Sequence, residues 1–391
     1  MRLRTVTITM LAAVTLLTTI EAGPQRGRPS TQPGNARKSK PLFVHRDDEG
    51  QAGRGRKKAR RAGEPSTIEV FKDFDAWWGE NRDGATLAAL GKTPGVDYFV
   101  HPVSELADGI SPNADVVLLT SNSWGQLTTR NDENAPAAQA NLAAFVGSGG
   151  VLIVDMGDND DTGGFLAPGA VGTPALVFPD EESDATLAGA AAGPDGVLGT
   201  ADDHRLVRGP DGVAGTADDL TNENIDACCY VAHGNLENGI TLPPTARTLM
   251  TARFGGAATP IVAEYCMGSG RVILDTVTKE FGAHQPEGVG PSYFLSALLA
   301  YALDPSEHIP CQINGLRESL RWMAAFQPFA DGLDAKLRVA TAAIESGQTI
   351  AVCGKLGAFN NAVRAHTRAL TPAVANDWIA RAGRVRSALG C

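Results

Sequence analysis

The amino-acid sequence predicts an α/β protein: a doubly wound, mostly parallel sheet with an acidic insertion and a C-terminal helical bundle. Three observations predict it. Between residues 67 and 155, apolar runs of strand length alternate with stretches of helical period, the order from which right-handed crossovers build a parallel sheet. From about residue 180 to residue 227, repeated Gly and Asp replace this pattern. After Cys311 the periodicity is helical.

The first half of the sheet domain supplies its strands and helices in turn. Strands are expected at 67–71, 97–100, 114–120 and 151–154. Helices are expected at 83–90, 103–108 and 136–146. The third and fourth strands are continuous apolar runs, which are typical of parallel strands buried on both faces. The Gly-rich stretch 147–150 ends the third helix, because glycine readily adopts the conformation that follows a helix.

A strand hairpin and one more helix complete the sheet domain. The apolar stretches 260–265 and 271–275 are separated only by Cys266–Gly270, which favours a hairpin. An apolar helix is expected at 293–303, and Asp304-Pro305 ends it because the residue before a proline avoids helical geometry. The predicted α/β domain therefore covers residues 66–305, with the insertion at about 180–227.

Residues 311–391 are expected to form a small helical module. Its helices are predicted at 333–345, 353–366 and 372–389. Thr371-Pro372 marks the start of the last one, since Thr is a favoured N-cap and Pro a favoured first helical residue. Cys353 and Cys391 bracket the last two helices. Antiparallel packing brings the ends of such a pair together, so we expect a disulfide between these cysteines.

The chain contains six cysteines, and an even number in an exported protein is typical of a disulfide framework. No Cys-x-x-Cys spacing is present, which argues against zinc. The pairing of Cys228, Cys229, Cys266 and Cys311 stays open, since two adjacent cysteines cannot easily serve one partner.

The N-terminus predicts export by the Sec route. Two arginines precede an apolar stretch from Thr5 to Ile20, so residues 1–22 are interpreted as a signal peptide that is cleaved before Gly23. An uncleaved anchor is the alternative. However, threonines interrupt the stretch, and a membrane span needs about 20 predominantly apolar residues. We therefore expect a secreted or periplasmic protein without a membrane span.

Residues 23–65 are predicted to be a disordered basic linker. They hold twelve Lys and Arg side chains against four acids, and few aromatic or branched ones. The basic run at 54–61 is either a solvated tail or a contact with an anionic surface. In the rest of the mature chain, acidic side chains outnumber basic ones by about two to one. Such a charge balance argues against nucleic acid as a partner.

Several motifs together carry a family resemblance. They are the buried strand Asp115–Leu119, a helix ending in Phe145-Val146, Gly149-Gly150 before the strand 151–154, and Gly268–Ile273. Their order resembles the class I glutamine amidotransferase-like superfamily, a flavodoxin-like fold, and in rhythm its trehalose-utilisation-like branch. The resemblance covers residues 67–304 apart from the insertion. The helical module, with its final Gly-Cys, resembles the tail modules of many secreted bacterial proteins.

In that family a cysteine nucleophile occupies the turn after the strand 151–154. This chain has Asp155-Met156-Gly157-Asp158 there. The resemblance therefore implies the fold without the covalent mechanism, because the turn offers no thiol or hydroxyl. We expect no glutaminase activity.

Acids mark this turn instead. Asp155 and Asp158 lie at the carboxyl end of a central strand, where open α/β sheets bind ligands. Such carboxylates can bind a hard cation or act as acid and base, or they can simply cap a solvated turn. His101 and His233 are the other candidates for a ligand or proton-transfer role, the alternative being ordinary loop histidines.

Aromatic residues suggest a class of ligand. Trp77, Trp78, Trp124 and Tyr98 can stack on the apolar face of a sugar, or they can pack in the core. Carbohydrate is therefore one candidate among extracellular or cell-surface ligands.

The insertion repeats one phrase, Gly193–Asp203 and Gly209–Asp219. The phrase resembles the Asp-Gly-x-x-Asp-x-x-Asp calcium repeats of exported proteins, except that Gly199 and Gly215 replace the middle acid. Calcium takes six to eight oxygen ligands, so each copy is ligand-poor. An acidic loop without calcium is the alternative. The candidate ligands are Asp195, Asp202, Asp203, Asp211, Asp218 and Asp219.

Two functions from different classes follow. The first is an exported amidotransferase-like domain that lacks the nucleophile and acts in binding, recognition or assembly. The second is a secreted hydrolase or carbohydrate-modifying enzyme that uses the acids at 155–161 with a histidine. Convergence of carboxylates and an imidazole on one pocket would favour the second.

Overall fold

A computed structural model describes residues 66–73, 82–120, 135–157, 167–182, 184–225, 230–278, 292–324 and 329–391. The predicted signal peptide and basic linker lie outside these ranges, as do Asp158, Cys228, Cys229 and three of the four aromatic candidates, Trp77, Trp78 and Trp124. Among the helices described, none is both long and apolar enough to cross a membrane.

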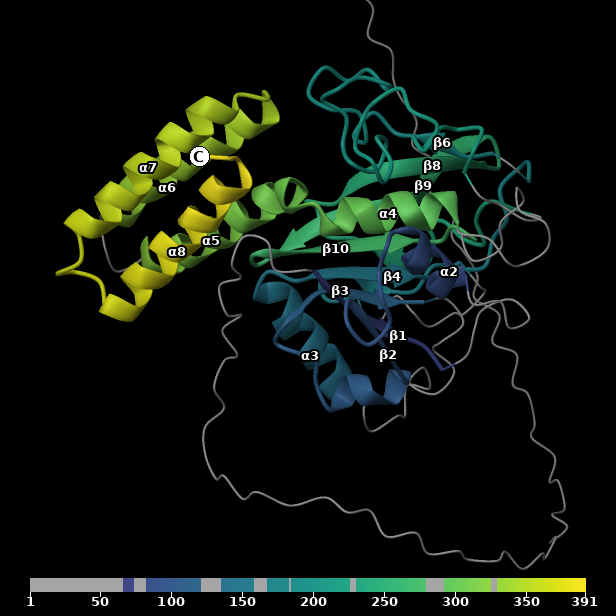
Figure 1. Ribbon diagram of the computed structural model, residues 1–391, viewed down its shortest axis with the longest axis horizontal. Helices are drawn as coiled ribbons and strands as arrows, with labels where there is room; N and C mark the ends of the chain where they lie inside the picture. Colours follow the sequence, from purple (N-terminus) through teal and green to yellow (C-terminus); the bar gives the residue numbers. More distant parts are fainter. Residues whose placement is uncertain are drawn as a thin grey trace, which may run out of the picture. The chain divides into compact units, whose positions relative to one another are not determined.

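A mostly parallel mixed sheet forms the centre of the α/β domain (Figure 1). Its order is β2-β1-β3-β4-β10-β9-β8-β6. The parallel part comprises β2 (Tyr98–His101), β1 (Thr67–Phe71), β3 (Ala114–Leu119), β4 (Val151–Asp155) and β10 (Gly270–Asp275). The antiparallel part comprises β9 (Ala257–Met267), β8 (Arg247–Phe254) and β6 (Thr186–Leu187). The expected hairpin is therefore confirmed as the β9–β10 pair, and β5 (Val171–Gly172) and β7 (Ile240–Thr241) form a separate two-stranded ladder.

Helices cover both faces of the parallel strands. On one face, α2 (Arg82–Ala89) and α4 (Tyr293–Leu303) enclose a core with alternate strand residues such as Ile153 and Ile273. On the other face, the 3-10 helix η1 (Val103–Ala107) and α3 (Ala135–Gly147) pack on the intervening residues, such as Val154 and Leu274. The continuous apolar runs of the sequence are thus explained by burial on both sides.

The insertion is built from turns but also contributes to the core. Leu206, Val207 and Leu220, which lie between or after the repeats, are buried in the same cluster as the residues of α4. The tips of the two repeats are different, since Val197 and Val213 are more than half exposed. The repeated phrases themselves therefore form surface turns, while the residues around them fix the insertion to the sheet.

The C-terminal region is helical, as expected. It comprises the 3-10 helix η3 (Pro305–His308), α5 (Ile309–Ala324), α6 (Phe329–Glu345), α7 (Thr349–Ala365) and α8 (Pro372–Ala388). Thr371 caps α8 by accepting a hydrogen bond from the amide of Val374. These helices bury a core of their own. The predicted Cys353–Cys391 disulfide is confirmed, with the two Cα atoms 6.0 Å apart.

The turn between β9 and β10 joins this module to the sheet. A second disulfide links Cys266 in β9 to Cys311 in α5. Gly315 of α5 packs so closely on the turn that an added Cβ would lie 2.2 Å from Oγ of Ser269. Arg381 of α8 donates a hydrogen bond of 3.0 Å to the same hydroxyl. The module therefore rests on a glycine contact that a larger residue would disturb.

Candidate functional site

Four polar residues continue neighbouring parallel strands at their carboxyl ends: Lys72 after β1, Thr120 after β3, Asp155 in β4 and Asp275 in β10. We call them the polar row. Asp155 and Asp275 are register partners. Leu119 pairs with Phe71 on one side and with Val154 on the other. The next residue of each strand therefore places Thr120 between Lys72 and Asp155. Side chains alternate along a strand, so all four continue the face that α2 and α4 cover. Thr120, Asp155 and Asp275 are buried.

The two helices on this face begin at the same edge. Asp83, in the first turn of α2, lies 3.4 Å from the Lys72 ammonium in a nearly buried ion pair. Ser292 caps α4 by accepting a hydrogen bond from the Leu295 amide, and its own amide donates to the Thr86 hydroxyl of α2. The N-cap of α4 thus contacts α2, and the first turn of α2 contacts the polar row at Lys72.

The predicted residue Asp155 serves the turn that follows it. Its Oδ1 accepts a 3.0 Å hydrogen bond from the amide of Gly157, and Met156 occupies the position between them. An added Cβ on Gly157 would lie 2.4 Å from the Val277 carbonyl oxygen, so only glycine fits this turn. The carboxylate therefore has a local structural task in the turn that follows β4.

His233, in the segment that follows the insertion, reaches the same turn. Its ring hydrogen-bonds the backbone of Gly157. Burial lowers the pKa of His233, and this hydrogen bond only partly opposes the shift. The imidazole is thus neutral at neutral pH. The structure therefore brings His233 and Asp155 to the backbone of one glycine.

His101 lies elsewhere on the edge. It ends β2, which is separated from β4 by β1 and β3, a lateral distance of roughly 14 Å at about 4.8 Å per strand. Its Nδ1 lies 3.1 Å from Glu105, and its ring stacks on Phe71. The two candidate histidines therefore do not share a site.

A cavity lies between α2 and the strands β1 and β2. The ion pair of Lys72 and Asp83 lines it, together with Tyr98 and aliphatic side chains. Its volume of about 190 Å³ is below the range of about 300 to 1,000 Å³ that is usual for ligand pockets. Tyr98, proposed as a stacking residue, is mostly buried in the core.

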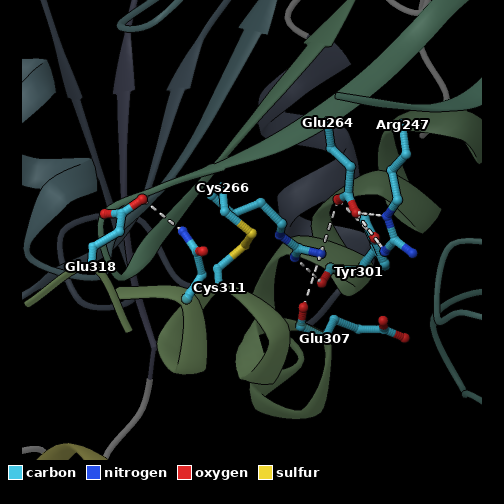
Figure 2. The surroundings of a disulfide bond; sticks show 9 residues. Arg247, Glu264, Cys266, Tyr301, Glu307, Cys311 and Glu318 are labelled. Atoms are coloured by element: carbon cyan, nitrogen blue, oxygen red, sulfur yellow. Dashed lines mark hydrogen bonds and ion pairs between the residues drawn. A yellow bond between two sulfur atoms is a disulfide. The ribbon is translucent and has the colours of Figure 1, made fainter. Parts of the chain in front are cut away.

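A buried charge network lies beside the Cys266–Cys311 disulfide (Figure 2). Glu264 of β9 binds the guanidinium of Arg247, accepts a 2.7 Å hydrogen bond from the Tyr301 hydroxyl and lies 3.3 Å from Arg271. Burial alone would raise the pKa of Glu264, but the two guanidinium groups and the hydroxyl outweigh it and hold the pKa below its usual value. The Arg271 guanidinium also lies 4.1 Å from the centre of the Tyr301 ring.

The insertion joins this network through His204. Its Nδ1 lies 2.6 Å from Glu307, and its Nε2 lies 3.3 Å from Arg247. The imidazole therefore bridges the Glu307 carboxylate and the Arg247 guanidinium. Burial opposes ionisation of Glu307, but the His204 ring and the Arg205 amide overcome it and lower its pKa to about 2. These contacts connect the insertion, three strands and the α4–α5 joint.

The two calcium-like repeats adopt one hydrogen-bond pattern. Asp202 and Asp218 accept hydrogen bonds from the amides of Asp195 and Asp211, and from the hydroxyls of Thr200 and Thr216. The Thr200 hydroxyl is the main cause of the lowered pKa of Asp202. For Asp218, desolvation would raise the pKa, but the hydrogen bonds outweigh it and lower the pKa. In each copy, the second acid of the Asp-Asp pair, Asp203 or Asp219, accepts from a glycine amide at 2.6 Å. Carboxylate oxygens of Asp211, Asp218 and Asp219 lie within 4.8 Å of one another, whereas the described residues of the first copy form no such group.

Sequence reasoning found Asp155 and missed most of its neighbours. Lys72, Thr120 and Asp275 share one signal with it, because each is the first polar residue after an apolar strand of the parallel series. Comparing the ends of all strands would have found them. The charge network carries no such signal, since Arg247, Glu264 and Arg271 look like exposed strand residues until the helices cover them.

Fold and site together define an α/β protein with a mostly parallel mixed sheet, a polar carboxyl edge and a C-terminal helical region. No family model and no curated protein matches the chain. Among solved structures, it is similar to a protein described as "Cytoplasmic Protein STM3548 from Salmonella typhimurium". The identity is 13% and the TM-score 0.33, over 61% of this chain and 97% of that one. A likeness at this level carries no functional argument.

Proposed function

We propose that the protein is an exported, doubly wound amidotransferase-like domain that has lost the nucleophile and acts by binding. The turn after β4 carries the proposal. Asp155 there is buried and holds the Gly157 amide, and Met156 follows it. The four described cysteines are all in disulfides away from this turn. Side chains committed to structure in this way support recognition rather than covalent catalysis.

Export is part of the proposal. The two disulfides support an oxidising compartment, since such bonds are rare in reducing ones. Sequencing of the secreted protein should find an N-terminus near Gly23. A retained Met1 would reject cleavage.

Turnover assays test binding against catalysis. The purified protein should release no ammonia from glutamine and hydrolyse no nitrophenyl acetate, phosphate or glycoside. The matched variants are Asp155→Asn and His233→Gln, with His101→Gln as a control three strands away. The proposal would be contradicted if the protein hydrolysed one of these substrates, if both site variants abolished that activity while remaining folded, and if the His101→Gln control retained it.

The rival function, a hydrolase, is favoured by one observation. His233 is neutral and contacts the turn that Asp155 holds, so an imidazole base and a carboxylate lie near one point. If the protein is a hydrolase, its activity should rise with pH as the His233 imidazole loses its proton. The midpoint of this rise should lie below about pH 6.5, the ordinary pKa of an imidazole.

We also propose that the insertion binds calcium weakly. The three clustered carboxylates of the second copy support this, and the six candidate aspartates provide the only acids of the repeated phrases. The affinity should lie near about 10⁻⁴ to 10⁻³ M, the range of extracellular modules. Millimolar calcium should slow protease cleavage between residues 184 and 225, and Asp218→Asn should remove this protection. Unchanged cleavage would leave an acidic loop.

A further inference from the structure

We infer that an aromatic platform, formed by Phe178 and the partly exposed Tyr230 over the buried ring of His233, binds the face of a sugar ring. The inference rests on the proposed binding function and gives it a ligand class. The rings of Phe178 and Tyr230 have centroids 4.9 Å apart, and Phe178 meets the His233 ring edge-on at 5.2 Å. None of these residues belongs to the aromatic set that sequence reasoning singled out.

The platform is held by a rigid backbone ladder. Val177 donates its amide to the His233 carbonyl, and His233 donates its own amide to the Thr276 carbonyl just past β10. The Thr278 hydroxyl in turn donates to the Tyr230 carbonyl at 2.8 Å. The aromatic residues therefore continue the sheet beyond β10 and do not lie on a free loop.

Exposure distinguishes the platform from core packing. Phe178 is 46% exposed and Leu176, two residues earlier on the same side of the extended segment, is 45% exposed. An aromatic ring stabilises a fold mainly through burial, so a ring that remains half exposed contributes only part of that energy. Two neighbouring exposed apolar side chains on a segment tied to the sheet mark a candidate binding surface.

The position of the platform agrees with the proposed site. His233 belongs both to the platform and to the turn at Gly157, which follows β4. Open α/β sheets bind ligands beyond the carboxyl ends of their strands, and this is the edge at which the platform lies.

Local charge disfavours an anionic ligand, because the segment after Phe178 carries four acids, Asp180, Glu181, Glu182 and Asp184, and Arg253 is the cation that binds two of them. Asp180 accepts hydrogen bonds from the amides of Gly255 and Gly256, and Asp184 binds Arg253 at 2.8 Å. Glu181 lies 3.5 Å from the same guanidinium. These acids are thus already engaged by donors. A sugar suits the remaining chemistry, because its C–H face is attracted to the negative face of an aromatic ring and its hydroxyls bind carboxylates and carbonyls.

Calorimetric titration of the mature protein with cellohexaose, chitohexaose, xylohexaose and maltohexaose tests the inference. At least one should bind, and Phe178→Leu, which keeps an apolar side chain but removes the ring, should weaken it about tenfold. Tyr230→Leu should act in the same direction. Phe99→Leu is the matched control, since Phe99 is similarly exposed but lies on β2.

Three outcomes would overturn the inference: none of the hexasaccharides binds, Phe178→Leu binds as well as the unmodified protein, or octa-arginine binds in a manner that Phe178→Leu abolishes. The last outcome would make the platform a site for cationic peptides. The proposed function is judged separately by the turnover assays, because an absence of sugar binding leaves their result unchanged.

Discussion

Glu264→Gln should destabilise the α/β domain strongly. Glu264 is buried and is the shared carboxylate partner of Arg247 and Arg271. The substitution preserves its shape but removes the charge that compensates two buried or half-buried guanidinium groups. Breaking a buried ion pair by removing one partner costs about 3 to 5 kcal/mol. For a domain of this size, a loss of 1 kcal/mol lowers the thermal midpoint by about 2 to 4 °C, so the midpoint should fall by at least about 6 °C.

The matched control is Glu318→Gln in α5, which Figure 2 shows on the other side of the disulfide. Glu318 is exposed to solvent and accepts a single 2.9 Å hydrogen bond from Asn314, so its variant should change the stability by less than about 0.5 kcal/mol. Differential scanning calorimetry of the two variants gives the comparison. A Glu264→Gln midpoint within about 2 °C of the control would refute the view that this network holds the joint together.

Three further predictions concern the joint and the helical module. The pKa of Glu307 is about 2, below its ordinary value of 4.5, so its carboxylate contributes stability that is present above about pH 4.5 and is lost as the pH falls through about 2. Urea titrations from pH 6 to 2 should show this loss of stability, and the Glu307→Gln variant should lack this pH dependence. Gly315→Ala should cost about 1 to 3 kcal/mol and speed proteolysis of the joint, because its Cβ overlaps Ser269; unchanged proteolysis would contradict this. Cys353→Ser should cost about 3 to 4 kcal/mol, since the bond to Cys391 closes a loop of 38 residues; an unshifted urea midpoint of the helical module would argue against it.

Burial on both faces made the centre of the fold predictable. The strands β3 and β4 contain the apolar runs 116–119 and 151–154, and the hairpin and α4 followed from turn and proline signals. In contrast, β8 and α5 were missed. Half of β8 is partly exposed and the strand carries arginines, so it lacks a continuous apolar signal. Helix α5 begins at Ile309, directly after the short helix η3, and Pro310 is its second residue.

The candidate site was less predictable, for a physical reason. A side chain such as Asp155 can be placed at a strand end from its own segment, but its neighbours come from other strands whose order the sequence does not state. His233 reaches Gly157 only through the hydrogen bonds that join residues 230–233 to the segment after β10. Phe178 gave no signal because a single aromatic residue in a loop does not reveal its exposure. Contacts over such sequence distances depend on tertiary structure.

Hydrogen exchange with and without the bound hexasaccharide tests most directly whether the carboxyl edge is the binding surface. Amides of residues 155–157, 176–178, 231–234 and 276–278 should exchange more slowly with ligand, because these segments form the turn, the platform and its ladder. Amides at the opposite edge, such as those of the β9–β10 turn, should be unchanged. Protection confined to the helical module or to the repeats, or no protection with any of the four sugars, would contradict the account.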